Sequence, residues 1–262
     1  MEIIGYIASI LIGVLLGLIG GGGSILTVPV LVYLFAIMPV SATAYSLFIV
    51  GVTSVVGSIS YFKKGLVNVR TAIVFGIPSI IAVYMTRKFL VPAIPAELFT
   101  FGDFVVSKNI FLMLLFAALM IVASYTMLKP KKSEQQVIIE PQHFNYPLIL
   151  LEGGIVGMIT GLVGAGGGFL IIPALVILAK LPMKEAVGTS LVIIAAKSLF
   201  GFSGELGQAD IAWSFLFSLT GLAILGIFLG SYLLKYVNGD KLRPAFGVFV
   251  LVKGIYILTK EI

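Results

Sequence analysis

The stretch GLIGGGGSILTVPVL at residues 17–31 returns 144 residues later as GLVGAGGGFLIIPAL at residues 161–175. Eight of these fifteen aligned positions are identical. The same offset holds over 45 residues and also aligns Gly13 with Gly157, Ser54 with Ser198 and Gly57 with Gly201. Drift in composition does not keep one offset over this length, so the sequence predicts an internal duplication.

The composition assigns the chain to a lipid bilayer. Hydrophobic residues make up 60% of the 262 positions and charged residues only 11%, so a soluble globule would expose far too much apolar surface. We therefore predict an all-α polytopic membrane protein with ten apolar segments, five in each half. These segments are 3–19, 25–38, 43–62, 71–86, 109–128, 148–163, 169–179, 186–203, 211–234 and 244–259.

The four segments next to the glycine tracts are short. A full crossing needs about 20 apolar residues, so we expect these segments to be either steep short helices or re-entrant pairs. The glycine runs are expected to break the helices near the midplane, where free backbone groups must face protein or a wet cavity. Paired helix breaks in two halves of a membrane protein are typical of a transport site.

The linker between the copies predicts the orientation. The hydrophilic stretch 129–147 separates a first transmembrane repeat at 1–128 from a second at 148–262. Because this linker is basic, we place it in the cytoplasm. An odd number of crossings in each half then makes the two repeats inverted and turns both termini outward. Most cations fall inside under this threading, and those left outside are Arg87, Lys88, Lys108 and Lys260.

The residue types present exclude several kinds of protein. The chain has no cysteine, which removes disulfides, thiolate nucleophiles and Cys-ligated metals. Its single histidine, His143, lies in the polar linker, so neither a metal site nor a cofactor is expected. The first segment lacks a basic n-region and a cleavage site and is expected to be retained. The net charge of +6 reflects cytoplasmic loops, so nucleic acid is not an expected partner.

The glycine tracts are the first candidate site. We expect a helix to start after each tract, at Ser24-Ile25 and at Phe169. The first N–H groups of a helix have no intrahelical acceptor and carry the positive end of its dipole, which favours an anion. The alternative is that the glycines only permit close helix packing. The candidate residues are Gly20, Gly21, Gly22, Gly23, Ser24, Gly164, Ala165, Gly166, Gly167 and Gly168.

The third apolar segment of each copy is expected to form a second wall of this site. It offers hydroxyls at Ser46 and Thr53 in the first copy and at Thr189 and Ser190 in the second. Lys197, the counterpart of Thr53, lies eight residues before Glu205, about 12 Å from that end of a helix. A lysine at that depth costs several kcal/mol unless paired or hydrated, so it marks a pathway. Lys197 is interpreted as a substrate-facing cation or as a structural partner of carbonyls or a carboxylate.

Two acids follow this segment. Glu205 and Asp210 lie near the predicted outer mouth. They are candidates for proton coupling, and the alternative is that they are solvated loop acids.

The doubled pattern Gly-Leu-x-Gly-x-Gly-Gly-x-x-Leu-x-x-Pro, at Gly17–Pro29 and Gly161–Pro173, resembles the TauE/SafE sulfite-exporter-like permeases. The resemblance spans nearly the whole chain and includes the Ser-Leu pair in each third segment. It implies a secondary transporter in a prokaryotic cell membrane. Such a protein would move sulfur-containing anions such as sulfite or organosulfonates by alternating access, often outward, with the anion and the lipid bilayer as its partners.

Two other classes remain open. A passive anion channel would use the same helix ends without coupling to a gradient. A membrane enzyme is disfavoured because no histidine cluster, cysteine nucleophile or pair of intramembrane carboxylates is visible. The sequence also lacks a Walker-type phosphate loop. Transport energy is therefore expected to come from ion or substrate gradients.

Overall fold

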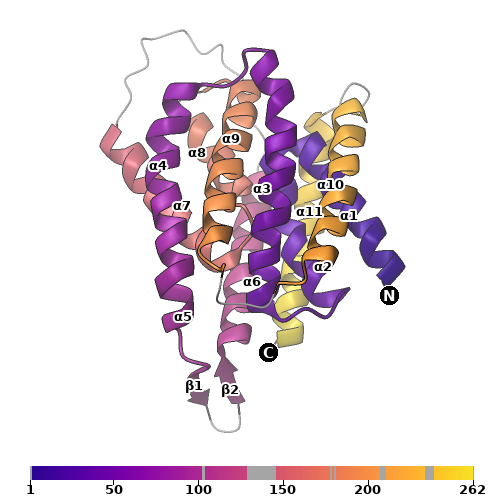
Figure 1. The fold of residues 1–262 in the computed structure, drawn as a ribbon, viewed down its shortest axis with the longest axis vertical. Helices are drawn as coiled ribbons and strands as arrows, with labels where there is room; N and C mark the ends of the chain where they lie inside the picture. The colour runs from indigo at the N-terminus through magenta and orange to yellow at the C-terminus, as the bar shows by residue number, and fades with distance from the viewer. Residues whose placement is uncertain are drawn as a thin grey trace.

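The computed structural model describes residues 2–101, 104–128, 146–177, 179, 181–206, 211–233 and 239–261, and they form a bundle of helices (Figure 1). Each of the ten expected apolar segments corresponds to one helix among these residues. The helices are α1 Glu2–Ile19, α2 Thr27–Tyr33, α3 Pro39–Lys63, α4 Val69–Met85, α6 Lys108–Leu128, α7 Tyr146–Val163, α8 Gly168–Ile177, α9 Met183–Ser203, α10 Trp213–Leu233 and α11 Gly239–Glu261.

Five helical stretches of the described residues are long and apolar enough to cross a membrane: Pro39–Lys63, Val69–Ala93, Lys108–Tyr125, Met183–Ser203 and Trp213–Leu233. The second of these continues α4 through the π-helical turn η2, Thr86–Leu90, into the short α5, Val91–Ala93. The chain is therefore an integral membrane protein that crosses the bilayer several times.

The described residues also include a β-hairpin that the sequence analysis does not predict. Strand β1, Glu97–Phe101, pairs antiparallel with β2, Phe104–Ser107, between α5 and α6. This hairpin projects from one end of the bundle (Figure 1). Its sequence is rich in Phe, Val and Thr, which favour extended backbone.

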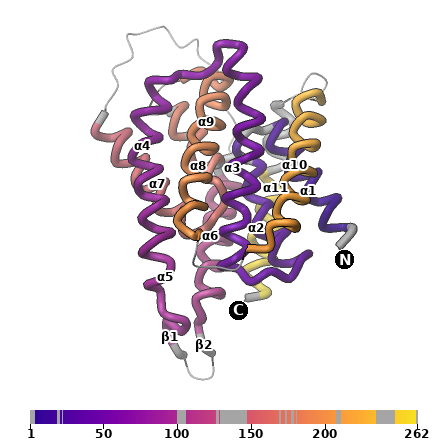
Figure 2. Tube along the Cα trace, in the orientation of Figure 1, coloured from indigo at the N-terminus to yellow at the C-terminus, as the bar shows by residue number. Residues whose placement is uncertain are grey.

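The short helices beside the glycine tracts form two helical hairpins, α1–α2 and α7–α8. Helix α7 runs down the bundle beside α4, and α8 returns to the end where α9 begins (Figure 1). The α1–α2 pair enters from the opposite end and returns to the start of α3 (Figure 2). Each pair of short helices thus runs into the bundle and back, and the re-entrant geometry stays a prediction.

The two hairpins make equivalent contacts with the other half of the chain. A Cβ added at Gly13 of α1 would lie 2.0 Å from the carbonyl oxygen of Ala223 in α10. At the equivalent position of the second copy, a Cβ on Gly157 of α7 would lie 2.5 Å from the carbonyl oxygen of Ser79 in α4. Both pairs differ by the same offset of 144 residues. The duplicated glycines therefore allow the same backbone-to-backbone packing twice.

Helices α3 and α9, the third segments of the two copies, pack against each other and run antiparallel. Gly201, near the end of α9, faces Leu47 near the start of α3. Gly51 faces Leu199, and Gly188, near the start of α9, faces Tyr61 near the end of α3. Equivalent segments of the two copies thus point in opposite directions within the bundle.

The outer surface of the bundle suits lipid. Along α4, every fourth residue is an apolar side chain that is at least half exposed: Val69, Ile73, Ile77, Ile81 and Met85. This spacing puts them on one face of the helix. A contiguous apolar stripe of this kind is unfavourable in water but is satisfied by acyl chains.

An accessibility experiment tests the inverted arrangement. Lys64, just after α3, and Leu206, just after α9, are exposed, and the parent chain has no cysteine to react. In oriented vesicles, a membrane-impermeant thiol reagent should label Lys64→Cys from the cytoplasmic side and Leu206→Cys from the outer side. Labelling of both positions from one side contradicts the inverted model.

Candidate functional site

The two glycine tracts meet in direct backbone contact inside the bundle. A Cβ added at Gly168 would lie 2.2 Å from the Cα of Gly21, and one added at Gly21 would lie 2.6 Å from the Cα of Gly168. Real Cβ atoms do not approach other atoms this closely, so a side chain at either position forces the tracts apart. Ile194 of α9 closes one side of this crossing, since a Cβ on Gly21 would also meet its Cδ1 at 2.3 Å.

The first tract does not break the helical path as the sequence analysis expects. Gly20–Leu26 winds as a 3-10 helix, η1, and leads directly into α2 at Thr27. The expected helix start at Ser24-Ile25 is therefore wrong. Tighter i to i+3 winding is common at helix ends, and glycine adopts it without a steric cost.

The second tract is a true turn. Gly164, Gly166 and Gly167 have φ angles of +72°, +64° and +71°, in the left-handed region that favours glycine. The N–H groups of Leu170 and Ile171 both donate to the carbonyl of Gly167, at 3.0 Å each, as α8 begins. The helix start predicted at Phe169 lies at Gly168 in the structure.

Ser24 joins the two tracts. Its side chain is fully buried, and its hydroxyl is within hydrogen-bond distance of the carbonyl of Gly21, at 2.7 Å, and of the carbonyl of Ala165. The second of these contacts links positions 141 residues apart. Ser24 therefore fixes the first tract against the second.

Lys197 lies against the second tract. Its side chain is 1% exposed, and Nζ donates to Oγ1 of Thr160 in α7 at 2.9 Å. A Cβ added at Gly167 would lie 2.6 Å from this Nζ. The ion pair found among the described residues joins Arg87 to Glu205, so Lys197 has no carboxylate partner in that part of the chain. A buried, unpaired cation next to a turn of left-handed glycines can hold an anion.

The predicted hydroxyls fall into two groups. Ser46 is fully buried, and its Oγ has no hydrogen-bond partner in the described part of the chain. In contrast, Thr53 donates to the carbonyl of Ile49 at 2.7 Å, and Ser190 to that of Val187 at 2.8 Å, so both serve their own helices. Thr189 accepts from the N–H of Asn68 at 2.9 Å, which places it at the α3–α4 connection rather than at the glycine crossing.

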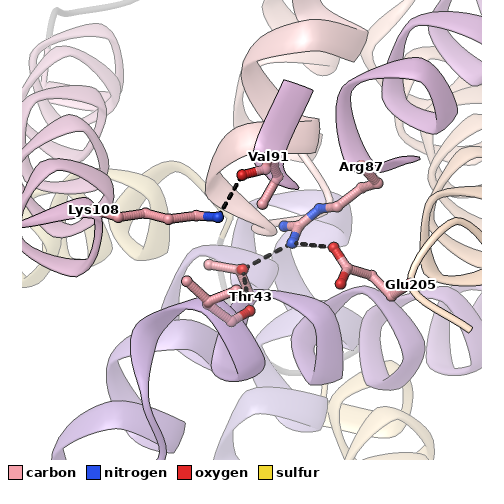
Figure 3. Close-up of polar contacts among 6 residues, drawn as sticks. Thr43, Arg87, Val91, Lys108 and Glu205 are labelled. Carbon is pink, nitrogen blue, oxygen red and sulfur yellow. Dashed lines mark hydrogen bonds and ion pairs between the residues drawn. The ribbon is translucent and has the colours of Figure 1, made fainter. Parts of the chain in front are cut away.

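Glu205 is not a solvated loop acid. It is 5% exposed, and its Oε1 lies 3.1 Å from Nη1 of Arg87, which is fully buried (Figure 3). The same Nη1 donates to Oγ1 of Thr43 at 2.9 Å. Of the two predicted acids, Asp210 lies outside the described residues.

Several polar residues of this region are not predicted from the sequence. Arg87 and Lys88 follow an apolar segment directly, which is typical of a loop, yet the helix continues to Ala93. The apolar run Phe89-Leu90-Val91 after the two cations was the available signal. Thr160 and the unpartnered hydroxyl of Ser198, next to Lys197, are the other residues missed.

A family model described as "Sulfite exporter TauE/SafE" matches residues 6–257 of the chain. The chain belongs to the TauE/SafE family. The resemblance seen in the doubled glycine pattern is therefore confirmed, and TauE/SafE membership indicates a membrane transporter.

Curated relatives of this TauE/SafE chain carry the same general description. A probable membrane transporter protein of Xylella fastidiosa (strain Temecula1) is 28% identical, over 96% of this chain and 92% of its own length. The probable membrane transporter protein YunE of Bacillus subtilis is also 28% identical, over 98% of both chains. YdhB of the same bacterium is 23% identical over 95% of this chain and 96% of its own length. No solved structure gives a significant match.

The contact between the tracts predicts unequal effects of two alanine substitutions in this TauE/SafE chain. Gly168→Ala should lower the free energy of unfolding by about 1–3 kcal/mol, because overpacking forces the backbones apart. Gly154→Ala in α7 is the matched control, since a Cβ there would meet nothing within 4 Å, and it should be neutral or slightly stabilising. Thermal unfolding in detergent measures both. Equal effects would show that the crossing is not tightly packed.

Proposed function

We propose that the protein is a secondary transporter that exports sulfur-containing anions, such as sulfite or organosulfonates, across a prokaryotic cell membrane. The observation that carries the proposal is Lys197, buried at 1% exposure, without a carboxylate partner among the described residues and against Gly167. TauE/SafE membership supports the substrate class, since the family is described by sulfite export.

The anion is proposed to bind at the second tract. Gly166 and Gly167 are in left-handed conformations, and N–H groups in such turns can form a concave anion-binding surface. The N–H of Gly167 already donates to the carbonyl of Ala165 at 2.7 Å, so the proposed donors of the turn are its other N–H groups. The first N–H groups of the ten-residue α8 add the positive end of its dipole. Lys197 supplies the charge. The first tract instead packs against the second, and Ser24 and Gly21 position the turn.

An alternating-access carrier of two inverted repeats suits this geometry better than a passive channel. The backbones of the two tracts touch at Gly21 and Gly168, and a continuous water-filled pore cannot run through such a contact. The matched contacts of Gly13 and Gly157, together with the antiparallel α3 and α9, support two repeats that rock against each other about this crossing. Glu205 is the proposed proton-coupling acid, released when its contact with Arg87 breaks.

Substitution of Lys197 tests the site. Lys197→Met removes the charge but keeps much of the apolar length, so sulfite affinity should fall about ten- to hundredfold, the range expected for a charge-assisted hydrogen bond. Lys197→Arg should keep part of the affinity. Lys253→Met is the control, because Lys253 is an exposed lysine of α11. If Lys197→Met binds sulfite as the parent does but unfolds at lower temperature, Lys197 is only structural.

Counterflow tests the mechanism. Proteoliposomes that contain unlabelled sulfite should take up labelled sulfite faster than empty ones. The reason is that internal sulfite binds to the inward-facing carrier and speeds the return of its site to the outer side. A channel gives no such stimulation. Repetition of the assay with and without a pH gradient tests proton coupling, and sulfate, thiosulfate and methanesulfonate in place of sulfite define the range of anions.

A further inference from the structure

Arg87 is a buried cation with most of its hydrogen-bonding capacity unused. It lies in the π-helical turn η2 between α4 and α5 and is fully buried. Turns of this kind are frequent at functional sites. Burial of a guanidinium is costly unless its donors are paired, so the way in which Arg87 is paired decides what it does.

Both hydrogen bonds of Arg87 use a single nitrogen. Nη1 donates to Glu205 at 3.1 Å and to Thr43 at 2.9 Å. Nε and Nη2 are buried and have no hydrogen-bond partner in the described part of the chain. These two nitrogens form the edge of the guanidinium that binds two oxygens of one carboxylate, phosphate or sulfonate at once. That edge therefore lacks an acceptor.

The charges around this edge favour an added anion. Lys108, at the start of α6, extends toward the Arg87 guanidinium and donates to the carbonyl of Val91 (Figure 3). Among the described residues drawn in Figure 3, two cations, Arg87 and Lys108, thus lie near one carboxylate, that of Glu205, which is paired with Arg87. Lys108 is half-buried, whereas Arg87 and Glu205 are buried. The surplus positive charge of these described residues acts at a buried guanidinium, where it attracts an anion more strongly than it would at the surface.

The cluster adjoins the proposed transport site. Thr43, which accepts from Arg87, packs against the second glycine tract, and a Cβ added at Gly164 would lie 2.4 Å from its carbonyl oxygen. Lys197 adjoins the other part of the same tract at Gly167. The turn therefore lies between two buried cations, Arg87 from η2 and Lys197 from α9.

We propose that Arg87 is a second anion-binding residue, which takes an oxyanion through Nε and Nη2 on the predicted outer side of the second glycine tract. The ligand class is a small oxyanion with two oxygens in reach of the fork, such as a sulfonate, sulfite or carboxylate. Only the choice of sulfite and sulfonate as probes rests on the proposed function. Glu205 is the resident carboxylate that lowers the positive charge until the anion arrives.

Binding of methanesulfonate and sulfite, measured by calorimetry in detergent in the Lys197→Met background, isolates this site. Arg87→Lys keeps the charge but loses the planar fork of two donors. The affinity for both anions should therefore fall, by up to about tenfold. Glu205→Gln removes the competing carboxylate, so both should bind several-fold more tightly. Added sulfite should also restore the thermal stability that Glu205→Gln loses. Lys88→Met is the control, because it removes the neighbouring but exposed cation.

Weaker anion binding in Arg87→Lys together with tighter binding in Glu205→Gln supports the proposal. Unchanged affinity in Arg87→Lys, or weaker binding without thermal rescue in Glu205→Gln, overturns it and leaves a structural ion pair. If Arg87→Lys fails to fold, the Glu205→Gln result decides alone. If the parent shows no sulfite flux but acetate or phosphate stabilises it through Arg87, the proposed function fails and this inference stands. If the parent transports sulfite normally but neither Arg87→Lys nor Glu205→Gln changes anion affinity, the proposed function stands and this inference fails.

Discussion

The structure depends on the contact between two glycine tracts inside an apolar bundle. Gly21 and Gly168 touch through their backbones, so neither position has space for a Cβ. Without a hydrophobic effect between helices in lipid, close packing of small residues is a main source of association. The helical hairpins α1–α2 and α7–α8 therefore meet where the sequence is poorest in side chains, and Ser24 joins them through the carbonyl of Ala165.

The duplicated halves share their packing but not their charges. Gly13 and Gly157 make equivalent contacts with α10 and α4. The buried Lys197, Arg87 and Glu205 have instead the uncharged counterparts Thr53, Ser231 and Tyr61 at the offset of 144 residues. Each buried charge costs several kcal/mol unless it is paired. Their restriction to the surroundings of the second tract avoids that cost at the first tract, and in the proposed function it provides one positive region for an anion.

Burial of these charges also bears on how such a protein moves. Lys197 is held by one hydroxyl, that of Thr160, and Arg87 by one carboxylate and one hydroxyl. Under the proposed function, these few partners among the described residues leave donors for an anion. The anion can change the balance between two conformations only if it binds one of them better. In the proposed mechanism, the cations that gain acceptors from the substrate provide that difference in affinity.

The sequence by itself determined the class, the duplication and the positions of the helices, because hydropathy and a constant offset are local or periodic properties. It also indicated the burial of Lys197, since a cation in the middle of an apolar segment is visible without a fold. The role of Lys197 in transport stays a prediction. The tertiary structure alone decided that the first glycine tract forms the 3-10 helix η1 and that Glu205 is buried. It also decided that Thr189 accepts a hydrogen bond from the α3–α4 connection. It also brought Arg87 into the bundle. Two successive cations after an apolar segment are read as a loop, and only the partners that α3 and α9 bring to Arg87 from distant parts of the chain make its burial favourable.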